Sequence, residues 1–228
     1  MSDIRYVTGV TPQAVDGDDK FLAVQGTRDG AIYTMDWGMA KALEGRVYVA
    51  NAGSVTSELT FGAGDIDTTE PDLFLSVPLG TTVVPLEIRV KMQAYGTTLI
   101  FELMAATGTG GVAGTDTNLT YGTLWGNLRS DGPNSSLCTV GHSSAADATY
   151  MTTNVVEFWR EGIMLAATTA TGDDDSSKLG ETWVWNAKQA GWAPVLVGAS
   201  QLMVFASSQA GKGFITIVYA EFPSTRIS

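Results

Sequence analysis

Apolar and polar residues alternate without interruption along residues 86–93, LEIRVKMQ, where every second residue from Leu86 to Met92 is apolar. Successive side chains of a β-strand point to opposite faces of the sheet, so this segment presents one apolar face and one charged face. We predict a strand that packs on a core with one face and meets water with the other.

Similar patterns recur along almost the whole chain. They predict further strands at residues 30–37, 46–50, 58–61, 72–77, 98–104, 155–160, 163–168, 181–185, 201–206 and 213–222. Glycine-containing turns separate several of them, and REGI at residues 160–163 is typical of a tight hairpin turn in which Gly162 takes a positive φ. Only residues 39–44, closed by Gly45, predict a helix. Because successive parallel strands need crossover helices, this pattern favours an all-β fold, an antiparallel β-sandwich or barrel.

Two regions depart from the strand pattern. Residues 1–25 are polar, and we expect either a mobile tail or an arm that crosses onto a neighbouring subunit, followed by a single domain of residues 26–228. Residues 107–153 are rich in Gly, Thr, Ser and Asn and are too long for an ordinary connection. We expect that they hold short strands or form one long loop excursion over an end of the sandwich.

Composition and charge exclude several classes of protein. The formal net charge of −11 would repel a phosphate backbone, so we expect no direct nucleic-acid partner. The single cysteine, Cys138, rules out an internal disulfide and a cysteine-based zinc site. The sequence has no basic segment followed by an apolar run at its start and no 18 consecutive apolar residues. We therefore expect a soluble protein without a secretory signal and without a membrane partner.

Three local motifs resemble catalytic or cofactor sites but lack the context that the chemistry needs. The run GHSSA at residues 141–145 imitates a nucleophile elbow, yet His142, the only histidine, is adjacent to Ser143 and cannot act as its base. Cys138 and His142 could share one face of a strand, but two ligands are too few for a structural zinc site, and a lone cysteine is typical of a buried core position. The run GTGGVA at residues 108–113 matches a dinucleotide fingerprint that works only when it opens a helix, and a loop-like segment follows it.

Acidic and aromatic groups offer further candidates. Acidic residues cluster at Asp16, Asp18 and Asp19, at Asp65, Asp67 and Glu70, and at residues 173–175. None has a full calcium-loop pattern, so we expect solvated turns and no metal site. Asp65 and Glu70 could in principle form a glycosidase carboxylate pair, which would have to converge across a sugar. Trp183 and Trp185 share a strand face: if Val184 faces the core the pair is exposed for a partner, and if the pair is core it indicates nothing about binding.

The tracts at residues 26–37, 44–48, 71–92 and 214–223 together resemble the jelly-roll virion proteins of tailed bacteriophages, most of all capsid decoration (cement) proteins. The resemblance implies a β-sandwich of the jelly-roll type that has no enzymatic activity and no cofactor. It also implies a homo-oligomer, a homotrimer, seated on the major capsid protein at the virion surface after synthesis in the host cytoplasm. The candidate contact residues for a subunit or capsid partner are Tyr33, Met35 and Trp37, on one face of the strand predicted at residues 30–37.

Two other functions compete with this interpretation. A receptor- or glycan-binding module, such as a phage fibre head or a lectin, would carry exposed aromatic residues and acidic loops at one end of the sandwich. A glycosidase on a sandwich fold would need two carboxylates converging in a cleft.

Overall fold

The computed structural model describes residues 36–54, 56–61, 65–94, 100–111, 117–143, 149–164, 181–207 and 211–224. The chain divides into two units, residues 1–40 and residues 41–228. Only residues 36–40 of the first unit are described, so the predicted arm of residues 1–25 and its boundary with residues 26–228 lie outside the described residues.

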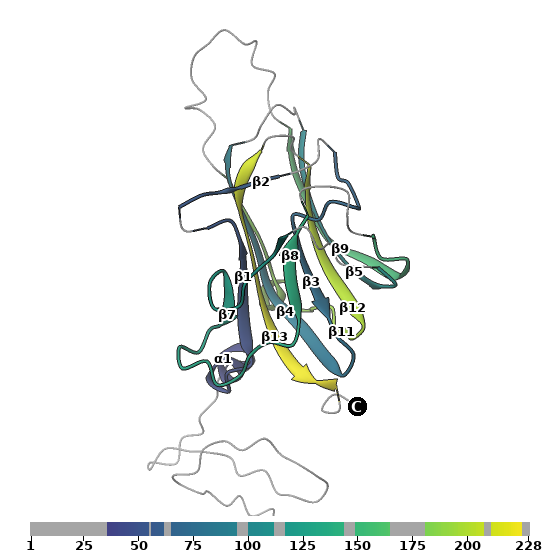
Figure 1. Ribbon diagram of the computed structural model, residues 1–228. Helices are drawn as coiled ribbons and strands as arrows, with labels where there is room; N and C mark the ends of the chain where they lie inside the picture. Colours follow the sequence, from purple (N-terminus) through teal and green to yellow (C-terminus); the bar gives the residue numbers. More distant parts are fainter. Residues whose placement is uncertain are drawn as a thin grey trace, which may run out of the picture. The chain divides into compact units, whose positions relative to one another are not determined.

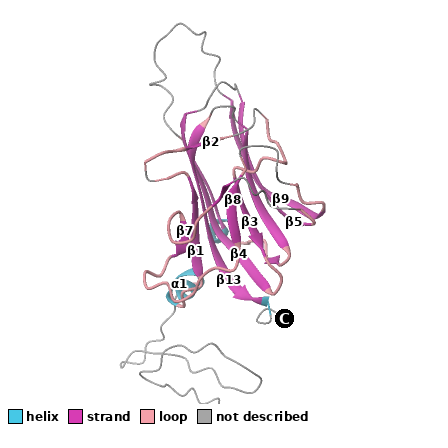
Figure 2. Cartoon of the chain, viewed as in Figure 1, coloured by secondary structure: helices cyan, strands magenta, loops and turns pink. Residues whose placement is uncertain are grey.

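Two antiparallel sheets pack together into an all-β sandwich, as predicted (Figure 1; Figure 2). The first sheet has the order β10 (Thr182–Asn186), β4 (Thr81–Ala94), β13 (Lys212–Pro223), β1 (Val47–Ala52), β7 (Trp125–Asn127), with β11 (Leu196–Val197) paired to β4 and β2 (Leu59–Thr60) paired to β13. The second sheet has the order β6 (Thr117–Asn118), β8 (Thr139–His142), β3 (Leu73–Val77), β12 (Ser200–Ser207), β5 (Ile100–Thr109), β9 (Thr153–Met164). Two short helices, α1 (Trp37–Leu43) and α2 (Ala187–Ala190), complete the described elements.

The alternation that predicted the strand at residues 86–93 is confirmed in β4. Ile88, Val90 and Met92 are completely buried in the core between the sheets, whereas the residues between them are polar and partly or fully exposed. Leu86 is only half-buried because it lies at a β-bulge: Val218 of β13 pairs with Glu87, and the next residue, Tyr219, pairs with Pro85. The extra residue of a bulge reverses the alternation, which is why Val83 is also buried although it is an odd number of residues from Ile88.

A second apolar cluster covers the other face of the second sheet. Leu73 and Leu75 of β3 point into the main core, and Phe74 between them packs in the second cluster. Met151 and Tyr150, from the region after β8, pack in this cluster too. Every residue of β12 is buried, which explains the unbroken apolar run from Leu202 to Ala206.

The region at residues 107–153 contains short strands, the first of the two alternatives expected from its sequence. β7 pairs with β1 in the first sheet, and β8 pairs with β3 in the second. The part described at residues 117–143 therefore contributes β7 to the first sheet and β6 and β8 to the second, and we call it the insertion.

Two local predictions are wrong. The hairpin turn at residues 160–163 does not form, because β9 runs straight through it: Arg160 pairs with Met104 and Gly162 pairs with Glu102 of β5. A long neighbouring strand offers a continuous set of backbone partners, and this outweighs the local turn preference of glycine. Trp37 does not continue a strand from residue 30, because it is the first residue of α1. Asp36 precedes it and its Oδ1 accepts a hydrogen bond from Gly38 N at 3.0 Å, as an N-terminal helix cap does.

The helix predicted at residues 39–44 is confirmed as α1, which begins two residues earlier, at Trp37, and ends at Leu43. Gly45 follows α1 with a φ of +67°, a left-handed conformation that favours glycine and ends the helix. No helix among the described residues is long and apolar enough to cross a membrane.

Candidate functional site

The predicted contact residues are only partly described. Tyr33 and Met35 lie outside the described residues. Trp37 is 47% exposed at the start of α1, so it cannot share a strand face with the other two as the sequence pattern suggested.

The described residues of the two motifs that resembled catalytic or metal sites, the GHSSA run and the pair Cys138 and His142, lie in or next to β8. His142 is the last residue of β8 and Ser143 is buried directly after it, while residues 144 and 145, the end of the elbow-like run, lie outside the described residues. Cys138 is 4% exposed, and its Sγ lies 3.5 Å from Glu221 Oε2. Burial, and then the negative charge of Glu221, raise the pKa of the Cys138 thiol far above its ordinary value.

The fingerprint and the acidic clusters give no clear site either. Gly108 and Thr109 belong to β5 rather than to a turn that opens a helix, and residues 112–116 are not described. Asp67 Oδ1 accepts hydrogen bonds from Thr69 N at 2.8 Å and from Thr69 Oγ1 at 2.7 Å, and these bonds lower the pKa of the Asp67 carboxyl. Asp16, Asp18, Asp19 and residues 173–175 lie outside the described part. Within the part that is described, no group of three or more His, Cys, Asp or Glu side chains could hold a metal ion.

The tryptophan pair on β10 faces the core. Trp185 is 5% exposed and Trp183 stacks on Phe101 with ring centroids 5.2 Å apart, whereas Val184 is 41% exposed. The alternative in which Val184 faces the core is therefore wrong. Trp185 joins an aromatic cluster with Phe158 of β9 and Trp192, and Trp192 is 51% exposed.

A buried polar network fastens the insertion to the last long strand. Trp125 Nε1 donates a hydrogen bond to Tyr219 Oη at 2.7 Å, and Ser136 Oγ lies 2.9 Å from the same hydroxyl. Glu221 is 6% exposed and its carboxylate accepts hydrogen bonds from Ser136 Oγ and from Leu137 N at 3.0 Å. Burial raises the pKa of Tyr219 well above its ordinary value. Because these groups are out of water and bonded to one another, the network holds residues 136–138 in one conformation.

Three large leucines on the outside of this network remain exposed. Leu43 is 58% exposed, Leu128 is 50% exposed and Leu137 is 68% exposed, and we call these three residues the leucine surface. All three are tied to the start of β1. Arg129 Nη1 donates to Leu43 O at 3.0 Å, and Leu128 N donates to Val47 O at 2.9 Å. Leu137 is held by Glu221, whose own N donates to Arg46 O at 2.9 Å.

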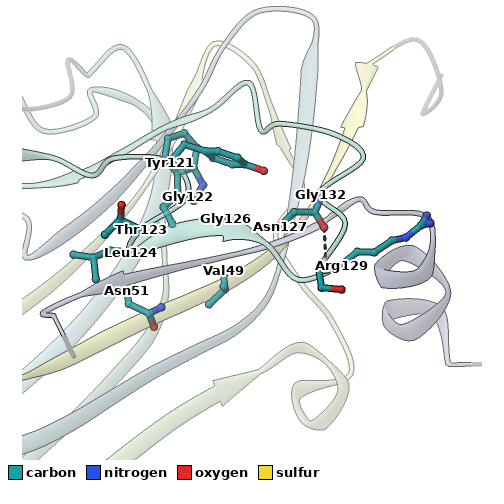
Figure 3. Close-up of a pocket in the computed structure, with 12 residues that line it drawn as sticks. Val49, Asn51, Tyr121, Gly122, Thr123, Leu124, Gly126, Asn127, Arg129 and Gly132 are labelled. Carbon is teal, nitrogen blue, oxygen red and sulfur yellow. Dashed lines mark hydrogen bonds between the residues drawn. The ribbon is translucent and has the colours of Figure 1, made fainter.

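A hollow of about 310 Å³ opens at the insertion, and Arg129, which donates to Leu43 O, is one of the residues that line it (Figure 3). Its wall is formed by residues 121–127 of the insertion, by Val49 and Asn51 of β1, and by Arg129, Ser130 and Gly132. Gly126 lies in this wall, and a Cβ atom placed on it would meet nothing within 4 Å. The hollow is therefore an open depression that the chain's own side chains do not fill.

Charges of both signs border the leucine surface and the hollow. Arg129 Nη2 lies 2.8 Å from Asp131 Oδ2, and Glu44 lies 2.9 Å from Lys41 Nζ and 3.7 Å from Arg46 Nε. Three cations therefore stand beside three carboxylates when Glu221 is included, in a chain whose formal net charge is −11.

Sequence reasoning did not find this surface. Leu128 and Leu137 stand in a stretch of glycine, serine and asparagine without a strand pattern, which gives no indication of which way they point. The available signal was the presence of large aliphatic residues in an otherwise polar stretch.

Comparison of the chain with protein-family models, with curated proteins and with solved structures finds no match in any of the three.

Proposed function

We propose that this chain is a structural virion protein, a capsid decoration (cement) protein that stabilises a phage head through self-association and through contacts with the major capsid protein. The observation that carries the proposal is the order of the strands. We further infer that the sandwich is of the jelly-roll type, a fold that recurs in viral coat proteins and in lectins.

The strand pairing supports this inference. The eight strands β1, β3, β4, β5, β9, β10, β12 and β13 pair in a nested way along the chain. The first pairs with the last, β1 with β13; the second with the second-last, β3 with β12; and the two inner pairs are β4 with β10 and β5 with β9. A long hairpin wrapped around a core gives this nested order, which is the arrangement of a jelly roll built from two Greek keys.

The surface and the composition support a structural role. The chain has one cysteine, which is buried, so a particle built from it would be stabilised by packing and by association rather than by disulfides. Association stabilises the folded state by mass action, because the partner binds the folded chain only. Exposed leucines next to balanced charges are a suitable surface for such contacts. Under this proposal the chain is made in the host cytoplasm and ends on the capsid surface, with a homotrimer as the expected assembly.

Mass spectrometry of density-purified virions tests this function. The proposal expects the chain in many copies per particle, in a fixed ratio to the major capsid protein. Its presence only in the lysate of infected cells, and not in washed particles, would contradict the proposal.

A receptor- or glycan-binding module is the second candidate, and one observation favours it. Trp192 exposes half of its surface beside Trp185, and Trp185 Nε1 is buried without a hydrogen-bond partner among the described residues. An exposed indole is a platform on which a sugar ring can stack.

Glycan-array binding separates the two functions. If the chain is a glycan-binding module, Trp192→Ala should abolish binding, and Trp37→Ala, which removes another half-exposed tryptophan, should not. An array on which the wild-type chain binds nothing would remove this candidate.

A further inference from the structure

We infer that copies of this chain associate through the insertion, with Leu137 of one copy seated in the hollow beside Gly126 of another. This inference rests on the proposed structural function and names the surface that carries self-association. Its partner is a second copy of the same chain.

The leucine surface is the first step of the argument. A single exposed leucine is ordinary, but here three of them, each at least 50% exposed, belong to segments that hydrogen bonds join near the start of β1. They are also fixed in place. The amide of Leu137 is bonded to a buried carboxylate, and that of Leu128 is bonded to β1. A side chain presented on a fixed backbone loses little further freedom when a partner covers it, so this arrangement favours binding.

The hollow is the second step, because it complements these side chains. An apolar cavity of about 150 Å³ is enough to hold a benzene molecule. The hollow, at about 310 Å³, has room for one leucine side chain, and it lies on the same insertion as Leu128 and Leu137. A surface that carries both a projecting residue and a depression able to accept it can bind a second copy of the same chain, either across a two-fold axis or head to tail around a closed ring such as a trimer.

Charge is the third step, and it selects the same region. Two copies that each carry a formal charge of −11 repel one another, so contact is less unfavourable where the local charge is balanced. At the border of the leucine surface, Arg129 and Asp131 are 43% and 57% exposed and can pair with their counterparts in a second copy. Apolar side chains at the centre with a charged rim match the usual anatomy of an interface, which takes about 800 Å² from each partner.

Light scattering coupled to size-exclusion chromatography of the full chain tests the inference. The wild-type chain should elute as an oligomer of at least two copies of 24.0 kDa, and the mass itself gives the number of copies. Leu137→Asp places a charge in the apolar centre, and Gly126→Trp places a bulky side chain at the hollow, where a Cβ atom on residue 126 meets nothing within 4 Å. Each variant should weaken association by about tenfold or more, the loss that follows when one buried anchor residue is removed.

A matched control separates the surface from a general effect of the substitution. Val156 is 54% exposed on β9 in the other sheet, and Val156→Asp should leave the mass unchanged. Each variant should have the circular dichroism spectrum of the wild-type chain, which shows that it is folded. If Leu137→Asp does not fold, Gly126→Trp still tests the surface, because it changes a different residue of the same contact.

The inference is overturned if the wild-type chain is a monomer at every concentration, or if either variant keeps the wild-type mass. The proposed function is judged separately from the composition of purified virions. A chain that is abundant in virions but keeps its oligomeric mass in both variants would contradict this surface and leave the proposed function in place.

Discussion

The hydroxyl of Tyr219 is the link between the insertion and the core, so its removal tests the account of the network. Tyr219→Phe keeps the ring, which stacks on Tyr48 with centroids 5.6 Å apart, and removes only the oxygen atom. Trp125 Nε1 then loses its acceptor at 2.7 Å in a residue that is 8% exposed, while Ser136 Oγ keeps its bond to Glu221.

The expected cost follows from that orphaned donor. A buried donor left without a partner lowers the free energy of unfolding by about 1–3 kcal/mol, which is a large part of the roughly 5–15 kcal/mol that stabilises a typical domain. For a chain of this length such a loss lowers Tm by roughly 2–12 °C. Urea unfolding followed by circular dichroism measures the free energy, and an unchanged slope against urea would show that the unfolded state is the same.

Tyr121→Phe is the matched control, because its hydroxyl donates to Asn134 O at 3.1 Å where water can replace the bond. It should change the free energy of unfolding by less than about 0.5 kcal/mol. If Tyr219→Phe costs no more than Tyr121→Phe, the network does not fasten the insertion and the reasoning is wrong.

Three further predictions concern other buried groups. Burial, and then the charge of Glu221, raise the pKa of Tyr48 to about 12 from an unfolded value of 10.0, so the contribution of Tyr48 to stability is full below pH 10 and is lost as the pH rises to 12. Tyr48→Phe should therefore flatten the fall of the unfolding free energy between pH 10 and pH 12, and an unchanged slope would contradict this prediction. Because the pKa of the Cys138 thiol is raised, a disulfide reagent at pH 8 should react with Cys138 of the native chain at least about tenfold more slowly than with Cys138 of the chain unfolded in urea. Equal rates would place the thiol outside the core. Asp72 is 2% exposed and its Oδ2 accepts a hydrogen bond from Ala206 N at 2.7 Å, so Asp72→Ala should lower the free energy of unfolding in urea titrations by about 1–3 kcal/mol. The control variant Asp131→Ala, on the surface, should change the free energy of unfolding by less than about 0.5 kcal/mol.

The strands were predictable because a strand that packs one face against a core has an apolar residue at every second position. β4 illustrates both the strength and the limit of that pattern. The buried run from Ile88 to Met92 is visible in the sequence, whereas the bulge at Leu86 depends on pairing with Val218 and Tyr219, which are more than 130 residues away.

The failures have the same cause. Gly162 looked like a turn because its sequence neighbours allow one, but β5 supplies a continuous pairing partner from far along the chain. Trp37 looked like the end of a strand, but Asp36 caps a helix that begins there. The leucine surface could not be predicted from the alternation of apolar and polar residues, because it forms only where α1, the start of β1, β13 and the insertion come together.

Electron cryomicroscopy of purified particles tests the central claim, that this sandwich is a self-associating component of a virion, most directly. The account predicts density of the size and shape of this β-sandwich, repeated over the capsid surface, with neighbouring copies in contact through the insertion. Capsids that carry no such density, or density restricted to a tail fibre, would contradict it.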